Sequence, residues 1–318
     1  MCKIIVQVWR FFTMQKIYTF LFLFFISLLL LCCKKPDITP AYLLLTQEDF
    51  TNCVDVSNFN KEHEKDYDNA ELEAIKHQIF KDVFVSLNGK ELGYWSLPCK
   101  IPLLPDYAGN NILRIIPCAR IPNTSLTTSQ YSFLKPVEKD FYFTKEGEHT
   151  VSNLKYEYEK SVSFPKLETF ETSTSFVSLD STLAKIVLSN YGDKKVGKIT
   201  LEDSLDFFNI ATDYFSLLGR GVRQYWEIYY KSENGEMTTY LGFKNTLSGV
   251  THQDMIVLPA TQGWKKVYID LTDIVSLACG MANMVSVRLG IRGLQNDENV
   301  SANFYFDYVK VITIAAPY

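Results

Sequence analysis

The sequence has few of the residues on which enzymatic catalysis most often depends. Only 4 of its 318 residues are histidine, and they are scattered along the chain. A GxSxG nucleophile elbow, an HExxH zinc motif, a complete Walker phosphate loop and a glycine-rich dinucleotide motif are all absent from the sequence. We therefore expect a protein without catalytic residues.

Cysteines are also few beyond residue 33, where only Cys53, Cys99, Cys118 and Cys279 occur. No CxxC or Cys/His spacing is present, which argues against a cysteine metal site. Cys99 and Cys118 lie on either side of a turn sequence at 106–111. If these flanking segments pair as a hairpin, the two cysteines come close enough for a disulfide; the alternative is two buried free thiols.

An excess of basic residues is missing as well. Residues 1–32 contain three basic residues and no acidic one, so residues 33–318 carry 29 basic and 36 acidic residues and a net charge of −7. Nucleic acids and anionic membrane surfaces favour a basic partner. The charge balance therefore argues against nucleic acid as a partner.

The only long apolar run stands near the start of the chain. Lys16 precedes fifteen uncharged residues, Ile17 to Leu31, which is shorter than the roughly 20 residues of a membrane span. The run ends in a Leu-Leu-Cys-Cys sequence that resembles a bacterial lipobox, with Cys33 as the lipid acceptor and Cys32 as the weaker alternative. We expect residues 1–32 to be a signal peptide, with Met14 as a possible true start.

A lipid such as palmitate on Cys33 would anchor the protein in the outer membrane, and residues 33–37 would form the tether. Lys34 and Lys35 follow the acceptor, and only one acidic residue, Asp37, stands beside them. Surface export of such lipoproteins is thought to need an acidic run at this place. Both orientations, toward the periplasm and toward the cell surface, therefore stay open.

Residues 38–160 are expected to form a small all-β sandwich. Its one strongly charged stretch, 48–73, is predicted to be a solvated loop or a short helix, and short alternating apolar segments follow it. Asn88-Gly89 lies between two such segments and predicts a hairpin with a type I′ turn.

Residues 161–175, with Pro165 and a Ser/Thr-rich run, are expected to be a linker or the first turn of a second domain at 176–318. Nine predicted strands, one of them covering residues 204–217, indicate a jelly roll there. Asn234-Gly235 predicts another hairpin, and residues 274–281 predict one helical turn.

Two resemblances support this division into two all-β domains. The segments VFVSLNGKELGYWSLPCKIPLL, YSFLKPVEKDFYF and VSNLKYEYE resemble the N-terminal domain of uncharacterised envelope lipoproteins of Bacteroidota-type bacteria. This resemblance implies an immunoglobulin-like or PEGA-like sandwich without assigned chemistry. The segments LETFET, WKKVYIDLTDI and NFYFDYVKVI resemble galactose-binding-like jelly rolls, a fold that includes carbohydrate-binding modules, adhesion domains and domains without a known ligand.

The most suggestive ligand-binding residues lie on one strand of the second domain. Side chains alternate across a strand, so Tyr225, Glu227 and Tyr229 share one face and the neighbouring Trp226, Ile228 and Tyr230 share the other. We expect the second set to pack in the core and the first set to face a sugar. Ordinary strand packing is the competing interpretation.

Two arginines alternate onto one face of a later strand, on either side of Gly290. We expect Arg288 and Arg292 to complete a polar cleft with Tyr225, Glu227 and Tyr229.

Jelly rolls of the resembled class often hold a structural calcium ion between their opening acidic turn and their last strand. The matching residues here are Glu171 and Asp307, whose oxygens suit Ca²⁺, although two carboxylates do not define a complete site. No other cofactor is expected.

These observations together predict a membrane-anchored, non-catalytic binding module for a glycan or an envelope protein. One alternative is a structural or assembly subunit of an envelope complex, in which the aromatic faces are protein interfaces. A hydrolase whose site escapes motif analysis is a further alternative.

Overall fold

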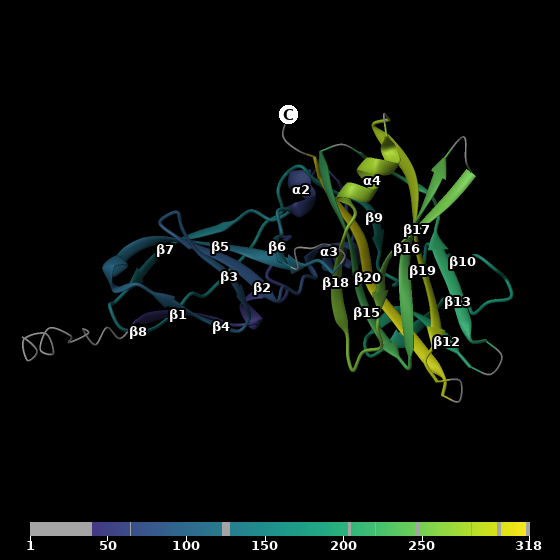
Figure 1. Ribbon diagram of the computed structural model, residues 1–318, viewed down its shortest axis with the longest axis horizontal. Helices are drawn as coiled ribbons and strands as arrows, with labels where there is room; N and C mark the ends of the chain where they lie inside the picture. Colours follow the sequence, from purple (N-terminus) through teal and green to yellow (C-terminus); the bar gives the residue numbers. More distant parts are fainter. Residues whose placement is uncertain are drawn as a thin grey trace, which may run out of the picture.

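Two β-sandwiches follow one another along the chain (Figure 1). The computed structural model describes residues 40–63, 65–122, 128–202, 205–219, 221–245, 249–280, 282–297 and 300–315. The predicted all-β class is confirmed, since strands build both halves and every described helix is short. Cys32 and Cys33 lie outside the described residues. Within the described ranges, no helix has the length and apolar character that a membrane span requires.

The first sandwich packs a three-stranded sheet on a five-stranded one. Its strands are β1 (Ala41–Leu45), β2 (Asp82–Leu87), β3 (Lys90–Ser96), β4 (Cys99–Leu103), β5 (Gly109–Arg120), β6 (Thr128–Gln130), β7 (Val137–Phe143) and β8 (Gly147–Thr150). The sheet orders are β4-β1-β8 and β3-β2-β5-β6, with β7 also paired to β5. Alternate residues such as Leu43 of β1 and Val85 of β2 fill the core between the sheets.

The acidic stretch after β1 was predicted to be a solvated loop or a short helix, and it contains short helices. They are η1 (Glu48–Phe50), α2 (Phe59–His63) and α3 (Asn69–Lys76), and a further turn, η2 (Pro105–Tyr107), precedes β5. Asp68 begins α3 with a capping box: its carboxylate accepts the Glu71 N–H at 2.8 Å, and the Glu71 carboxylate accepts the Asp68 N–H at 3.0 Å. The cap fixes where α3 starts, so its last turn reaches the second sandwich.

The second sandwich is the larger one. Its strands are β9 (Val162–Glu168), β10 (Phe176–Ser178), β11 (Val187–Tyr191), β12 (Lys194–Leu201), β13 (Phe207–Thr212), β14 (Phe215–Leu218), β15 (Val222–Glu233), β16 (Gly235–Asn245), β17 (Gly249–Leu258), β18 (Lys265–Asp270), β19 (Met284–Gln295) and β20 (Ala302–Ala315), with the helix α4 (Thr272–Cys279). The sheets run β11-β12-β20-β15-β18, with β9 also paired to β20, and β10-β13-β19-β16-β17, with β14 also paired to β19.

The strand positions of this half differ from the predictions in two places. Part of the expected linker at 161–175 is the strand β9, which pairs with β20 inside the second sandwich. The expected single strand at 204–217 consists of β13 and β14, which pair with successive parts of β19. Pro165 and the Ser/Thr-rich run suggested a break at 161–175 where a strand forms. Apolar residues continue through 207–217, so the sequence pattern did not mark the break between β13 and β14.

The two Asn-Gly pairs play different roles. Asn88 and Gly89 have φ angles of 51° and 77° and join β2 to β3, as the hairpin prediction required. The hairpin predicted at Asn234-Gly235 is wrong: β15 pairs with β18 and β20, whereas β16 pairs with β17 and β19. The chain therefore crosses from one sheet to the other at Gly235.

Cys99 and Cys118 do not face each other. Cys99 belongs to β4, which pairs with β1, and Cys118 belongs to β5, which pairs with β2, β6 and β7. The hairpin that would have brought them together is therefore a wrong prediction, and both cysteines are free thiols, as the alternative interpretation had it. Burial raises the pKa of Cys118 to about 12 and that of Cys99 to about 11, which keeps both thiols protonated.

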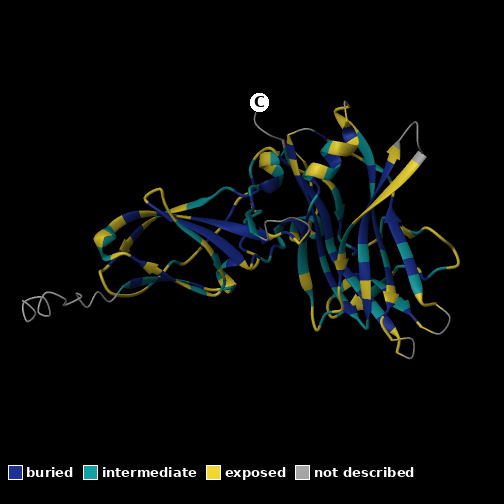
Figure 2. Ribbon diagram, in the orientation of Figure 1, coloured by how far each residue is buried: buried dark blue, intermediate teal, exposed yellow. Residues whose placement is uncertain are grey.

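The two sandwiches share part of one apolar core. Tyr225, Tyr268 and Ile312, all on strands of the second sandwich, pack in the core cluster of the first. The Tyr131 ring lies 6.1 Å from the Tyr225 ring and 5.7 Å from the Tyr268 ring, measured between centroids. Buried residues continue across the junction (Figure 2). This junction covers part of the outer face of the sheet that contains β15.

Candidate functional site

Glu227 lies at the centre of the junction and faces no solvent. Its carboxylate accepts hydrogen bonds from Gln78 Nε2 at 3.1 Å and from the Tyr131 hydroxyl, both of the first sandwich. Lys266 Nζ is 3.1 Å and Lys310 Nζ 3.5 Å from its Oε2. The Glu227 and Lys310 side chains are 0% exposed and that of Lys266 is 1% exposed. Glu227 is therefore an internal counterion.

The pKa values of these buried side chains follow from their burial and from the charges next to them. Burial raises the pKa of Glu227, but Lys310 and Lys266 outweigh that effect, so the pKa is lower than usual. Burial also lowers the pKa of Lys310 to about 7, against the opposing effect of Glu227. The Lys310 ammonium donates to the carbonyl oxygens of Ala74 at 2.6 Å and Ile75 at 3.0 Å, which ties α3 to β20.

The predicted ligand-facing set on β15 is thus only partly correct. Trp226, Ile228 and Tyr230 pack in the core of the second sandwich, as expected. Tyr225 and Glu227 do lie on the opposite face, but they are 1% and 0% exposed, so the prediction that they contact a ligand is wrong. The physical reason is that the first sandwich covers them. Of Tyr225, Glu227 and Tyr229, only Tyr229 lies outside the area that the first sandwich covers.

Tyr229 belongs to a group of half-buried rings on the uncovered part of the same sheet face. We call this group the aromatic cluster; it consists of Tyr191, Tyr229, Trp264, Tyr305 and Tyr308. The Tyr229 ring stacks on Trp264 with centroids 4.8 Å apart, and the Tyr191 ring lies 5.4 Å from both Trp264 and Tyr305. Four segments that are far apart in sequence therefore build one aromatic surface.

Lysines lie among these rings. Lys194 Nζ is 4.5 Å from the Tyr308 centroid, and Lys231 Nζ is 5.6 Å and 5.5 Å from the centroids of Tyr191 and Tyr305. Such distances allow cation–π attraction. The aromatic cluster thus offers flat apolar surfaces and hydrogen-bond donors side by side.

His77, at the end of α3, closes the aromatic cluster on the side of the first sandwich. Its ring lies 4.3 Å from the Tyr229 ring and 4.7 Å from the Tyr308 ring. Burial, followed by the charges of Lys266, Lys310 and Lys194, lowers the pKa of His77 to about 2. The imidazole is consequently neutral and acts as a further packing surface.

The expected calcium ligands do not form a cation site. Lys194 pairs with the Asp307 carboxylate and supplies the positive charge at that place. Glu171 lies near enough to raise the pKa of Asp307, after the larger effect of burial. In the ranges that the structure describes, no group of three His, Cys, Asp or Glu side chains is placed to hold a metal ion. The residues present therefore do not fit calcium.

Arg288 and Arg292 lie on the other sheet of the second sandwich. Arg288 Nη2 is 2.9 Å from His252 Nε2, and Arg292 Nη2 is 2.5 Å from Asp254 Oδ2, both on β17. Because β19 and β15 belong to opposite sheets, the predicted cleft that joins these arginines to Tyr229 does not form. Tyr240 lies between the arginines but is 1% exposed, so its ring is not open to a ligand.

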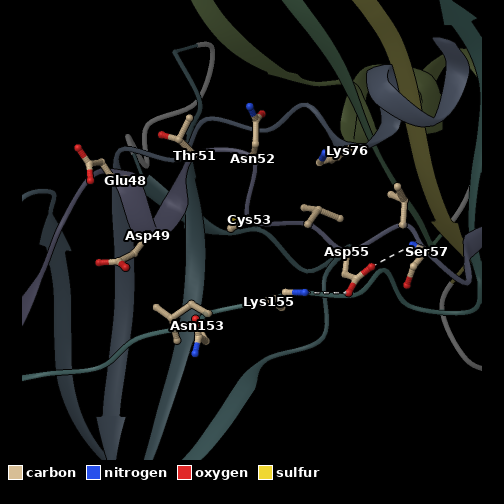
Figure 3. A pocket seen from close by; sticks show the side chains of 13 residues that line it. Glu48, Asp49, Thr51, Asn52, Cys53, Asp55, Ser57, Lys76, Asn153 and Lys155 are labelled. Atoms are coloured by element: carbon tan, nitrogen blue, oxygen red, sulfur yellow. Dashed lines mark hydrogen bonds and ion pairs between the residues drawn. The ribbon is translucent and has the colours of Figure 1, made fainter. Parts of the chain in front are cut away.

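A polar groove of about 560 Å³ opens on the first sandwich (Figure 3). Buried Cys53 and Leu154 form part of its floor, and acidic and basic side chains stand at its rim. Asp55 lies 3.7 Å from Lys155 and accepts the Ser57 N–H at 2.9 Å. Asp55 and Lys155 are thus paired with each other, and the mixture of acidic and basic side chains at the rim indicates no single class of ligand.

Sequence reasoning missed most of the aromatic cluster. One signal was present in the sequence: alternation within NFYFDY indicates that Tyr305 faces away from the core residues Phe304 and Phe306. Trp264 precedes β18 in a turn, and the role of His77 depends on a contact with a different domain. No local pattern indicates either position.

No family model matches the chain, and no curated protein matches it. Several solved structures are similar to it. One contains the CBM22-1 and GH10 modules of the N-terminal endo-1,4-beta-D-xylanase 10B from Clostridium thermocellum, complexed with xylohexaose. It has 11% identity and a TM-score of 0.35, over 48% of this chain and 28% of that chain.

Two further structures are carbohydrate-binding modules. One, from a study of promiscuous specificity in the β-sandwich superfamily, has 15% identity and a TM-score of 0.33, over 73% of this chain and 85% of that one. The other, a module specific for non-crystalline cellulose, has 12% identity and a TM-score of 0.33, over 47% of this chain and 94% of that one. At such TM-scores the likeness carries no argument about function.

Proposed function

We propose that this protein is a non-catalytic glycan-binding protein, anchored in the outer membrane by a lipid on Cys33, and that the aromatic cluster is its binding surface. The observation that carries the proposal is the presence of five half-buried rings on the uncovered part of an outer sheet face. Ligand sites combine aromatic surface with a few placed polar groups. Here Lys194 and Lys231 supply such polar groups, and each also pairs with a carboxylate, that of Asp307 or Glu233.

Two features of the fold suit a binding surface of this kind. Strands hold Tyr191, Tyr229, Tyr305 and Tyr308 in place, and a site on rigid elements loses little conformational freedom when a ligand binds. The buried junction next to the surface also fixes His77 at its border. The apolar face of a sugar ring would pack on the rings, while its hydroxyl groups would accept hydrogen bonds from the lysines.

A second candidate function is an assembly subunit of an envelope complex. Exposed apolar surface also marks protein interfaces, and the Tyr and Trp rings of the aromatic cluster are residue types enriched in them. In that case the same surface would bind an envelope protein. Both proposals include the same lipid anchor on Cys33.

The test compares the wild type with Tyr305→Ala and Trp264→Ala on a glycan array, using purified full-length protein. We expect both substitutions to abolish glycan retention. Tyr142→Ala is the matched control, because Tyr142 is a 64% exposed tyrosine of the first sandwich and its removal should leave retention unchanged. Melting temperatures of all variants show whether the fold is kept.

Absence of retention by the wild type, or full retention by both cluster variants, would contradict glycan binding at this surface. Capture of one envelope protein that is lost in Tyr305→Ala would favour the assembly role instead. The anchor is tested separately, because Cys33→Ser should move the protein from the membrane fraction to the soluble fraction of the cells.

A further inference from the structure

A second cavity lies at the junction of the two sandwiches and is separate from the aromatic cluster. Its volume is about 340 Å³, within the usual range of about 300–1,000 Å³ for small-molecule sites. Three chain segments line it: Ile79 and Lys81 before β2, residues 118–122 at the end of β5, and residues 266–268 of β18. Cavities between domains are frequent binding places for small ligands.

The walls of this cavity are largely apolar. Ile79 and Ile121 contribute aliphatic side chains, and Tyr268 contributes its ring, whereas the Val267 side chain packs against the core of the second sandwich. The Tyr268 hydroxyl is already satisfied, since it donates to Gln78 Oε1 at 3.0 Å. The walls therefore favour an apolar body, and burying such a body gains about 25 cal/mol for each Å² removed from water.

Every charged residue that lines the cavity in the described part of the chain is basic: Lys81, Arg120 and Lys266. The nearby acids are turned inward. Asp82, whose side chain is 4% exposed, accepts a hydrogen bond from Arg120 Nη2 at 2.8 Å, and Glu227 is shared between Lys266 and the buried Lys310. Glu227 thus balances Lys266 at the inner end, and near the mouth Asp82 is the acidic group that faces the two basic residues Lys81 and Arg120.

This excess of positive charge is placed asymmetrically. Lys81 is exposed and the Arg120 side chain is 55% exposed, so both reach the mouth of the cavity, whereas Lys266 is buried at its inner end. An anionic group at the mouth would interact with Lys81 and Arg120 without losing all of its hydration. A cation at the same place would be repelled.

We propose that the interdomain cavity binds a small amphipathic anion, with its apolar body against Ile79, Ile121 and Tyr268 and its carboxylate toward Lys81 and Arg120. The site is independent of the aromatic cluster, so it can be present whether or not the protein binds glycans. A ligand here would contact both sandwiches at once and would stabilise their junction through linkage.

Isothermal titration calorimetry with three probes of equal chain length tests the proposal on the full-length protein. Octanoate should bind saturably, whereas octylammonium should not, and octanol should bind more weakly than octanoate. Lys81→Glu should weaken octanoate binding by about tenfold or more, the effect expected from losing and reversing one charge contact. Lys145→Glu makes the same charge change at an exposed position between β7 and β8 and should have no effect.

Absence of saturable octanoate binding would overturn the proposal. Equal binding of octanol and octanoate would overturn the anionic part of it, and equal weakening by Lys81→Glu and Lys145→Glu would show that only net charge matters. Ile79→Phe, which enlarges a side chain that lines the cavity, should also reduce octanoate binding. Its melting temperature separates this effect from loss of the fold.

Discussion

Glu227 carries a negative charge in a place that water does not reach. Its desolvation is offset by two ammonium groups and by hydrogen bonds from Gln78 and Tyr131. A buried group of this kind contributes little net stability, but the removal of one member leaves the others without partners. The energetic role of Glu227 is therefore to neutralise Lys266 and Lys310.

Glu227→Gln should lower the free energy of unfolding by about 3–5 kcal/mol, because two lysines then lack a counterion in a buried place. The control is Glu233→Gln. Glu233 pairs with Lys231 at 2.5 Å, but its side chain is 40% exposed, so its removal should cost at most about 1 kcal/mol. Urea denaturation measures both values. Similar costs for the two variants would mean that the junction tolerates an uncompensated charge.

Alternation along β15 predicted which residues share a face, and it correctly placed Trp226 and Ile228 in the core. It did not predict what covers the other face, because Gln78 and Tyr131 lie about a hundred residues or more away in the sequence. The same limit applies to Arg292: alternation predicted that it shares a face with Arg288, but the assignment of β19 and β15 to different sheets depends on the topology.

At the level of elements, most strands could be predicted from local sequence and their connections could not. Asn88 and Asn234 both have positive φ angles and both precede a glycine. Only the first pair makes a hairpin, since an Asn-Gly pair favours a tight turn without determining which strands then pair. The close approach of the backbone at position 235 to the core of the sandwich explains why a glycine stands there.

Gly235→Ala should destabilise the fold by about 1–3 kcal/mol, the usual cost of overpacking a core. An added Cβ would lie 2.3 Å from the ring of Phe304, which is 0% exposed and has no free space to move into. Gly263→Ala is the control, because a Cβ there meets nothing within 4 Å. That change should be neutral or slightly stabilising. Thermal unfolding of both variants measures these changes in stability. An unchanged melting temperature for Gly235→Ala would contradict the close contact between position 235 and Phe304.

For the whole molecule, the junction makes the relative position of the two sandwiches depend on packed residues instead of a flexible linker. Lys310 connects β20 to the last turn of α3, and Tyr225 packs into the core of the first sandwich. Unfolding of one sandwich would expose the buried charges of the other. We therefore expect the two domains to unfold together, and the stability of both to depend on the protonation of Lys310.

The free energy of unfolding should rise by about 1 kcal/mol between pH 7 and pH 8. Burial lowers the pKa of Lys310 to about 7 in the folded protein, whereas the unfolded chain keeps the ordinary lysine pKa of 10.5. Over this interval the unfolded state binds more protons than the folded state. The contribution of Lys310 to stability is thus fully present only above its unfolded pKa, and it is lost as the pH falls through about 7.

Urea titrations at pH 7, 7.5 and 8 measure this rise, and Lys310→Met provides the control because it keeps the Glu227–Lys266 pair. The variant should show less than about half of the wild-type rise. The range stops at pH 8 because the buried thiols and tyrosines, whose pKa values are raised, reduce stability at higher pH once their unfolded counterparts ionise. An equal rise in the wild type and the variant would place the titrating group elsewhere, and two separate unfolding transitions would show that the junction does not couple the sandwiches.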